Sequence, residues 1–190
     1  MNESMKHEQQ PDDEYILTLF SHEESKERAF RLLMQKYQKE VYYAVRRMIY
    51  LHADTDDVTQ NVWLKVWRYL AGFRRDANLK TWLHKICINE AITFINNKKK
   101  IANPSNEEDY MLALLSTAAE EHYYSPDQMQ QLLNEAVARL PEKQRAVFNL
   151  RYYNEMPYEE MSKVLDTSVG ALKASYHIAA KKVEEFIVKH

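Results

Sequence analysis

The segment from residue 140 to residue 183 constrains the fold of this chain most, because it has the pattern of two short helices, a tight turn and a long helix. Pro141 and Pro157 each suit the start of a helix, where the missing N–H costs no hydrogen bond. Apolar side chains follow each proline at helical spacing. Only residues 166 to 168 separate the second short helix from the long one, whose N-terminus the threonine or serine there can cap. A connection this short forces a steep crossing angle between the two helices, as in a helix-turn-helix.

The long helix that starts near residue 169 has an apolar side and a basic side. Leu172 and Tyr176 share the apolar side and would hold the helix against the short one before it. The opposite side carries Lys173, Ser175, His177, Lys181 and Lys182. Such a helix is typical of proteins that read the major groove of DNA. A plain helical bundle with a solvated basic face would give the same pattern, so this segment needs support from elsewhere.

A second apolar helix is predicted from residue 54 to residue 73, with Asp54 as its N-cap. Valines form one stripe along it and tryptophans an adjacent one, so more than half of its circumference should be buried. The narrow strip left exposed contains Asp57, Gln60, Asn61, Leu64, Lys65 and Arg68. From the residues alone, a solvated helix face is the plainer interpretation of this strip, and a docking surface for a partner is the alternative.

The charge of the chain is unevenly distributed. Residues 74 to 100 carry seven cations and two carboxylates, a local net charge of +5 in a chain whose formal net charge is −2. This excess implies a polyanionic partner. Residues 101 to 130 carry six carboxylates and no Lys or Arg, a local net charge of −6. The acidic stretch thus separates two basic segments that could face DNA.

The composition favours a chain made only of helices. Two glycines and five prolines in 190 residues are few helix breakers. This length suits two modest helical domains better than one large core. The single cysteine, Cys87, excludes an internal disulfide. Because the sequence contains neither a long apolar run nor an apolar N-terminal signal core, we expect a cytoplasmic protein.

Three segments, in this order, resemble the bacterial sigma factors of the extracytoplasmic-function (ECF) type in the sigma-70 superfamily. Residues 54 to 67 resemble the family's stretch D-A-E-D-L-V-Q-E-x-F-L-x-x-W. Residues 81 to 89, TWLHKICIN, resemble T-W-L-Y-R-I-A-R-N. Residues 140 to 183 resemble L-P-x-x-x-R-x-V-F followed by Y-E-E-I-A and G-T-V-K-S-R-x-x-R-A-R-K-x-L. Together the segments cover most of the chain.

The resemblance implies an all-α fold of two small helical domains joined by an acidic linker. Residues 12 to 100 would be sigma region two, which binds core RNA polymerase and both recognises and melts the minus-ten promoter element. Residues 101 to 125 would be the linker, within which residues 110 to 115 have the pattern of a short amphipathic helix. Residues 126 to 190 would be sigma region four, with the helix-turn-helix that reads the minus-35 element. Such a chain directs promoter-specific transcription initiation.

The resemblance also assigns roles to individual residues. The polymerase-binding residues would be Asp57, Gln60, Asn61 and Leu64, which face the clamp of the largest polymerase subunit. Asn61 departs from the glutamate that is usual at its position. The minus-ten residues would be Arg74, Arg75, Asn78, Lys80, Lys85 and Asn89, which capture unpaired bases.

For the minus-35 element, the resemblance points to Ser168, Lys173, Ser175, His177 and Lys181, which would read duplex DNA. Here the chain departs from the family, because Ser175, Ile178 and Ala180 stand where arginine is usual and Ala171 replaces threonine. Without those guanidinium groups, we expect weaker binding or an unusual recognised sequence.

The expected partners are core RNA polymerase, through the clamp of its largest subunit and the flap of its second-largest subunit, promoter DNA and an anti-sigma factor. We expect no enzyme activity, no cofactor, no metal site and no small-molecule substrate. The sequence contains no H-E-x-x-H motif, no clustered Cys and His, and no glycine-rich phosphate loop. Two other classes remain open: a helix-turn-helix regulator that binds duplex DNA as a dimer, and a helical adaptor without a DNA role.

Overall fold

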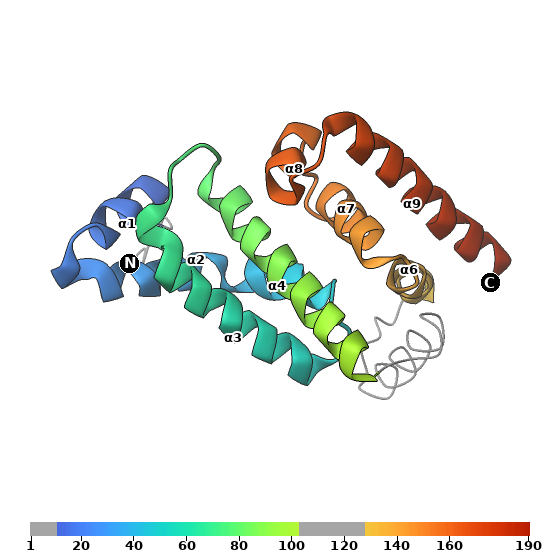
Figure 1. Ribbon diagram of the computed structural model, residues 1–190, viewed down its shortest axis with the longest axis horizontal. Helices are drawn as coiled ribbons and strands as arrows, with labels where there is room; N and C mark the ends of the chain where they lie inside the picture. Colours follow the sequence, from blue (N-terminus) through green and yellow to red (C-terminus); the bar gives the residue numbers. More distant parts are fainter. Residues whose placement is uncertain (1–10, 103–127) are drawn as a thin grey trace, which may run out of the picture.

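The computed structural model describes residues 11–102 and 128–190, and every element within these two ranges is a helix (Figure 1). The first domain comprises α1 (Asp13–Phe20), α2 (Lys26–Arg46), α3 (His52–Tyr69) and α4 (Leu79–Ala102), with short 3-10 helices at Glu23–Ser25 and Leu70–Gly72. The second domain comprises α6 (Gln128–Ala138), α7 (Glu142–Tyr152), α8 (Tyr158–Leu165) and α9 (Val169–Lys189). The all-α fold with two small helical domains is confirmed.

The predicted linker lies almost wholly outside the described residues, as does the amphipathic helix predicted at residues 110 to 115. The only described part of the linker is its start, where α4 continues to Ala102 rather than ending at residue 100. The basic run Lys98 to Lys100 therefore belongs to the last turns of α4. Cations there interact favourably with the negative end of the helix dipole.

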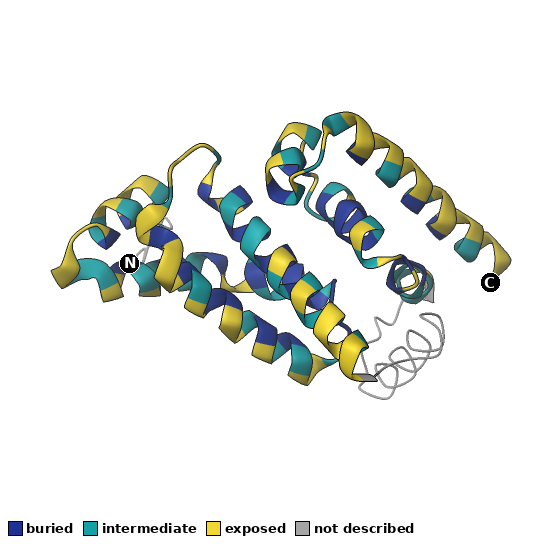
Figure 2. Ribbon diagram, in the orientation of Figure 1, coloured by how far each residue is buried: buried dark blue, intermediate teal, exposed yellow. Residues whose placement is uncertain are grey.

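The core of the first domain follows from helical spacing, and the buried positions of its helices face inward (Figure 2). The buried residues of α2 are Ala29, Leu33, Tyr37, Val41, Ala44, Val45 and Arg46. Trp67 of α3 packs edge to face against Phe20 and Phe30, with ring centroids 5.5 and 5.0 Å away. One side of this indole remains exposed, so the tryptophan stripe of α3 is less completely buried than its apolar pattern predicts.

Asp54 is not the N-cap of α3, so this prediction is wrong. The helix begins at His52 with Leu51 as its N-cap, which places Asp54 in the first turn. A carboxylate there is stabilised by the helix dipole without capping the helix. Its side chain pairs instead with Lys98 of α4, at 3.2 Å between Oδ1 and Nζ. Asp54 thus ties the start of α3 to the end of α4.

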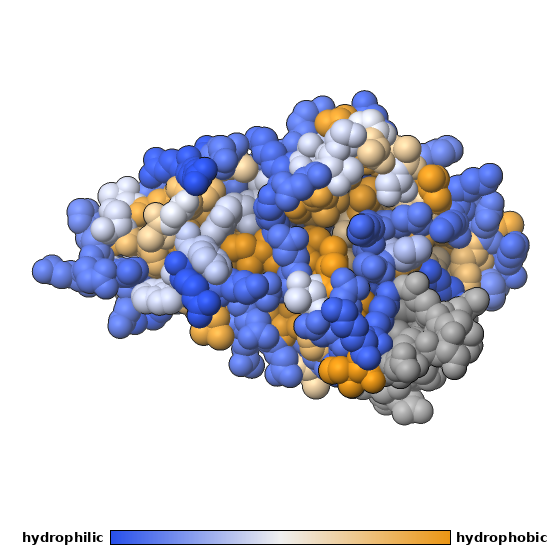
Figure 3. Space-filling model, in the orientation of Figure 1, coloured by the Kyte–Doolittle hydropathy of each residue, from blue (hydrophilic) through white to orange (hydrophobic). Residues whose placement is uncertain are grey.

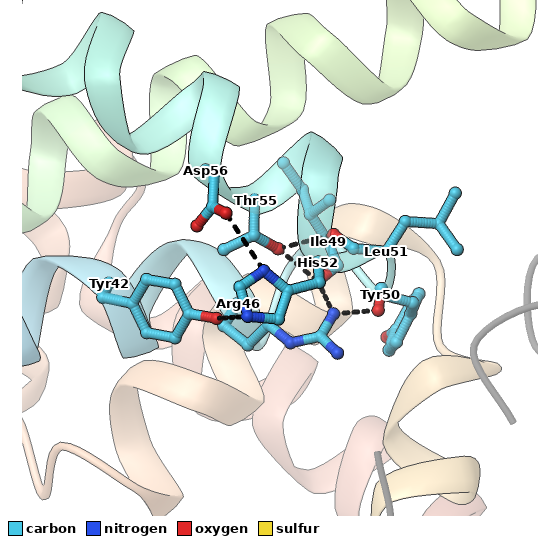
Figure 4. A network of polar contacts seen from close by, with 8 residues as sticks. All are labelled: Tyr42, Arg46, Ile49, Tyr50, Leu51, His52, Thr55 and Asp56. Atoms are coloured by element: carbon cyan, nitrogen blue, oxygen red, sulfur yellow. Dashed lines mark hydrogen bonds and ion pairs between the residues drawn. The ribbon is translucent and has the colours of Figure 1, made fainter. Parts of the chain in front are cut away.

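The turn between α2 and α3 is held by side chains that bind its carbonyl groups (Figure 4). The last carbonyls of a helix have no partner within the helix. Buried Arg46 donates from Nη1 to the carbonyls of Ile49, at 3.2 Å, and Tyr50. Thr55 of α3 donates from Oγ1 to the carbonyl of Leu51 at 2.8 Å. Because side chains bind these carbonyl groups, the turn has a defined shape.

The helix-turn-helix forms as its sequence predicts. Pro157 is the N-cap of α8, and the helix ends at Asp166, which has the left-handed backbone conformation with φ of 48°. Ser168 caps α9, because its Oγ accepts a hydrogen bond from the N–H of Ala171 at 3.3 Å. Leu172 and Ala179 form the buried side of α9. The short turn thus sets α9 across α8 with its polar side outward.

Replacing Ser168 with alanine should lower the free energy of unfolding by about 1 kcal/mol, because the first turn of α9 loses its cap. Urea unfolding followed by circular dichroism measures this change. Ser175→Ala is the matched control, since it removes a hydroxyl from the interior of the same helix, where alanine is favourable. Equal losses in the two variants would contradict a capping role for Ser168.

The two domains pack against each other, chiefly through α4 and α8 (Figure 1). One hydrophobic cluster contains Leu83 and Ile88 of α4 together with Met161 and Val164 of α8. Polar contacts also cross between the domains, as when Asn149 of α7 donates from Nδ2 to the carbonyl of Arg47 at 3.0 Å. The two domains thus share part of their core.

Candidate nucleic-acid and partner interfaces

The exposed strip of α3 lies where its sequence predicts. Asp57, Gln60, Asn61 and Leu64 are all exposed on one face of the helix. Their exposure follows from the opposite face, where Val62 and Val66 are fully buried. Leu64 is 64% exposed, the most exposed large apolar side chain of this helix. A large apolar side chain ringed by polar ones has the composition of a protein–protein contact.

A groove of about 520 Å³ lies beside the N-terminal half of α4. Its lining residues are Gly72, Arg74, Asp76, Ala77, Thr81, Trp82, Lys85 and Lys163. The half-buried ring of Trp82 lies against Phe73, with 5.5 Å between ring centroids. Within the first domain, the groove therefore combines an aromatic wall with two cations, Arg74 and Lys85, while Lys163 of α8 closes it. An aromatic face and cations are the groups needed to stack a base and bind its phosphates.

Three of the six predicted minus-ten residues lie on or near this groove. Arg74 and Lys85 line it. Asn89 is exposed on α4, seven residues after Trp82 and therefore two turns along the same face. Arg74, from the loop before α4, and Lys85 of α4 thus line one groove, and Asn89 lies farther along α4.

The other three predicted minus-ten residues have different neighbours. Arg75, whose φ is 62°, pairs with Glu14 of α1 at 2.8 Å. Lys80 pairs with Glu40 of α2 at 2.7 Å. Asn78 caps α4, because its Oδ1 accepts a hydrogen bond from the N–H of Thr81 at 2.7 Å. These contacts hold the loop and the start of α4 in place.

On α9, four of the five predicted minus-35 residues are exposed, namely Ser168, Lys173, His177 and Lys181, while Ser175 is half-buried. Lys173 lies 5.7 Å from the centre of the Tyr158 ring. Lys181 pairs with Glu185 at 3.9 Å. The hydroxyl of Ser168 is engaged by the cap of the helix. The side of α9 that α8 does not cover is therefore polar and accessible.

Sequence reasoning missed three side chains that shape these surfaces. Lys163 of α8 lines the groove of the first domain. Arg145 and Asn149 of α7 are buried against the turn after α2. The one sequence signal for Arg145 and Asn149 is that a charged and an amide side chain occur within an apolar helical run.

A buried pair, His84 and Cys87, lies on the side of α4 that faces α2. Burial raises the pKa of the Cys87 thiol, which therefore stays protonated. Burial also lowers the pKa of His84, although its Nε2 is 3.7 Å from Glu40. Among residues 11–102 and 128–190, no three His, Cys, Asp or Glu side chains gather as metal ligands would.

Acidification should destabilise the protein through His84. Its pKa is lowered in the folded state, mainly by burial, so below about pH 6.5 the unfolded chain binds more protons than the folded one. The stability contributed by the neutral imidazole is thus complete above pH 6.5 and is lost below it, by at most about 1.4 kcal/mol per pH unit. Urea unfolding between pH 7.5 and 5.5 measures the slope.

His84→Asn should flatten that slope, because an amide can still donate to the Lys80 carbonyl that Nδ1 contacts at 2.9 Å but does not titrate. Exposed His177→Asn is the control and should leave the slope as it is. If the unfolding free energy of His84→Asn depends on pH as steeply as that of the wild type, other groups cause the pH dependence.

None of the described helices combines the length and the apolar character needed to cross a membrane.

Two sequence families match the two domains. Residues 33–101 match the model described as Sigma-70 region 2, and residues 130–183 match Sigma-70, region 4. The RNA polymerase sigma-H factor of Pseudomonas aeruginosa is 26% identical over 167 residues, which cover 83% of this chain and 86% of the relative. The ECF RNA polymerase sigma-E factor of Escherichia coli K12 is 27% identical over 166 residues, with the same coverage.

Solved structures agree on the fold. CnrH in complex with the cytosolic domain of CnrY aligns with a TM-score of 0.65 at 20% identity, over 93% of this chain and 97% of that one. The sigma factor RpoE, in complex with the anti-sigma factor NepR from Bartonella quintana, aligns with a TM-score of 0.65 at 18% identity, over 83% and 96%. With both sigma regions present in order, the chain belongs to the sigma-70 family of RNA polymerase sigma factors and, within it, to the ECF type.

Proposed function

We propose that this chain directs promoter-specific initiation by binding core RNA polymerase through α3, unpaired minus-ten bases through α4 and the minus-35 duplex through α9. The observation that carries this proposal is the pairing of an exposed docking strip and an aromatic, basic groove in one domain with a helix-turn-helix in the other. The sigma-70 family, to which the chain belongs, consists of regulatory proteins, so the polymerase itself catalyses RNA synthesis.

The strip on α3 supplies the contact with the polymerase clamp. Leu64 would enter an apolar pocket, and Asp57, Gln60 and Asn61 would form the polar rim around it. The second domain would hold the flap of the second-largest subunit. Two contacts on one enzyme raise the overall affinity by making the second contact intramolecular.

The groove beside α4 favours separation of the DNA strands. An unpaired base can stack on Trp82, while Arg74 and Lys85 neutralise the neighbouring phosphates. A ligand shifts an equilibrium by its differential affinity for the two states. Because the groove can hold a base only after it leaves the duplex, binding favours the open promoter.

The exposed side of α9 supplies recognition of the minus-35 duplex. Lys173 and His177 lie in the first turns of the helix, the part that enters the major groove in a helix-turn-helix. Neither side chain offers the bidentate fork with which arginine reads guanine. We therefore expect this contact to depend strongly on phosphate binding and to weaken steeply with salt.

An anti-sigma factor is the further partner we propose. The structural neighbour RpoE was solved in complex with one. A sigma factor of this type competes for the polymerase, so a protein that covers its polymerase-binding or DNA-binding surfaces would control it.

The test is transcription by purified core RNA polymerase, with and without this protein, on a library of genomic fragments with transcript start sites as the readout. New start sites that share two upstream motifs would support the proposal. If the protein binds DNA but not core polymerase, it is a helix-turn-helix regulator instead. If it binds neither, it is a helical adaptor.

A further inference from the structure

We propose that the second domain acts as an internal lock on the minus-ten surface, with acidic side chains of α8 and the following turn occupying on α4 the places of DNA phosphates. This inference rests on the proposed function of α4 as a DNA-binding helix. It concerns the protein free of polymerase, in which the two domains pack together (Figure 1).

Two carboxylates of the second domain contact the DNA-binding face of α4. Asp166 lies 2.7 Å from the ammonium group of Lys85, a predicted minus-ten residue. Glu160 accepts a hydrogen bond from the hydroxyl of Thr81, also at 2.7 Å. Thr81 and Lys85 both line the groove. Carboxylate oxygens therefore satisfy the donors that phosphate oxygens would meet in the DNA complex.

A cation of the second domain closes the same groove. Lys163 of α8 donates from Nζ to the carbonyl of Asp76, at 3.1 Å, and forms part of the groove lining. Because Asp76 lies in the loop before α4, this contact bridges the loop and α8. A DNA strand that enters the groove would have to displace Lys163 as well as the two carboxylates.

A second set of contacts holds the far end of α4 and the turn after α2. Lys99 pairs with Glu142 of α7 at 3.1 Å. Although burial opposes it, hydrogen bonding by the backbone and Lys99 lowers the pKa of Glu142, so the pair is ionised at neutral pH. Arg145 donates to the carbonyl of Met48 at 2.9 Å. The domains thus meet over the length of α4 rather than at one point.

Apolar contacts as well as ion pairs hold the two domains together. Hydrophobic atoms are visible along the middle of the molecule beside α4, between its hydrophilic margins (Figure 3). Between the domains, the buried side chains of the shared cluster join Leu83 of α4 with Met161 of α8. Apolar burial persists at salt concentrations that screen exposed ion pairs. The closed arrangement is therefore compatible with a free protein in ordinary buffer.

The lock covers one of the two DNA-binding surfaces and leaves the other exposed. The outward side of α9 stays exposed while the groove beside α4 is covered in part by α8. Two promoter elements about two helical turns apart lie roughly 70 Å from each other. Adjacent domains cannot reach both elements, so α4 and α8 must separate before initiation. Polymerase binding would supply the energy for this separation.

Glu160→Gln with Asp166→Asn should raise the affinity of the free protein for a labelled 20-nucleotide single strand of mixed sequence by about tenfold, the factor expected when two partly exposed contacts lose their charge and are weakened. The control is Glu159→Gln with Glu184→Gln, which removes the same charge at two exposed sites of the same domain. Fluorescence anisotropy measures both. Equal affinities in the two variants would overturn the lock.

Cross-linking tests the closed arrangement without relying on DNA binding. In Lys99→Cys with Glu142→Cys, a reducible bismaleimide should join the two domains in high yield, while buried Cys87 stays unmodified. The joined protein should lose transcription and regain it on reduction. Joining Glu135→Cys to Arg139→Cys within α6 is the control and should leave transcription intact.

The outcomes separate the lock from the proposed function. If the uncoupled protein supports transcription but joining α4 to α7 has no effect, the lock is wrong and the sigma role stands. If the domains join in high yield but the protein never binds polymerase, the closed arrangement is real and the proposed function fails.

Discussion

Replacing Arg145 with methionine should lower the free energy of unfolding by about 3 to 5 kcal/mol, because three carbonyl groups lose a buried charged donor. Arg145 is 3% exposed, and its guanidinium group donates to the carbonyls of Met48, Ala138 and Leu140 at 2.9, 2.8 and 3.0 Å. It also lies 4.9 Å from the ring of Tyr50. Methionine keeps much of the apolar stem but leaves the three carbonyls without this donor.

Urea unfolding monitored by tryptophan fluorescence and by circular dichroism measures this loss. Arg151→Met is the matched control on the same helix, because its half-buried guanidinium donates from Nη1 to the carbonyl of Met156, at 3.2 Å. The control should lose about 1 kcal/mol. If the two variants lose the same amount, the carbonyl contacts of Arg145 are not what stabilises the fold.

Arg145 also shows why part of this structure could not be predicted from sequence. It lies 97 residues from Met48, whose carbonyl it binds across the domain boundary. No local pattern encodes which distant carbonyl a buried guanidinium will meet. What the sequence does show is a charged residue inside a run that is buried from position 145 to position 150. That conflict with the apolar pattern is the signal that marks such a contact.

Local features, by contrast, were predictable because local physics determines them. Pro141 and Pro157 are N-caps of α7 and α8, one residue before the helices they were expected to open. Ser168 caps α9 as one of the two predicted candidates. The Asp54 prediction failed by three residues, because a carboxylate is favourable both at the cap and in the first turn of a helix. Sequence alone does not separate those two positions.

The minus-ten surface could be predicted only in part from the sequence. Arg74 and Lys85 line one groove as their basic clustering suggests. Lys80 belongs to the same basic segment, yet it pairs with Glu40 of α2. Charge counts predict that a segment is basic but not which cations are engaged by carboxylates elsewhere in the fold. Those partners come from α1, α2 and the second domain, so they emerge only from tertiary packing.

Leu64→Asp should weaken binding to core RNA polymerase by at least about 30-fold, the cost of losing one hot-spot side chain. Leu64 is 64% exposed in the free protein, so its replacement removes little buried area and should leave the unfolding free energy within about 0.5 kcal/mol. Competition with a labelled wild-type protein for purified core enzyme measures the affinity.

Val188→Asp is the control for that experiment. Val188 is 81% exposed near the end of α9, so the variant adds the same charge to an exposed aliphatic site far along the chain from α3. Its affinity for core polymerase should stay within about twofold of the wild type. Equal losses in both variants would mean that added charge, rather than the face of α3, sets the affinity. Loss confined to Leu64→Asp, with unchanged stability, would show that an apolar side chain exposed in the free protein is retained for its partner, since it contributes almost nothing to the fold that carries it.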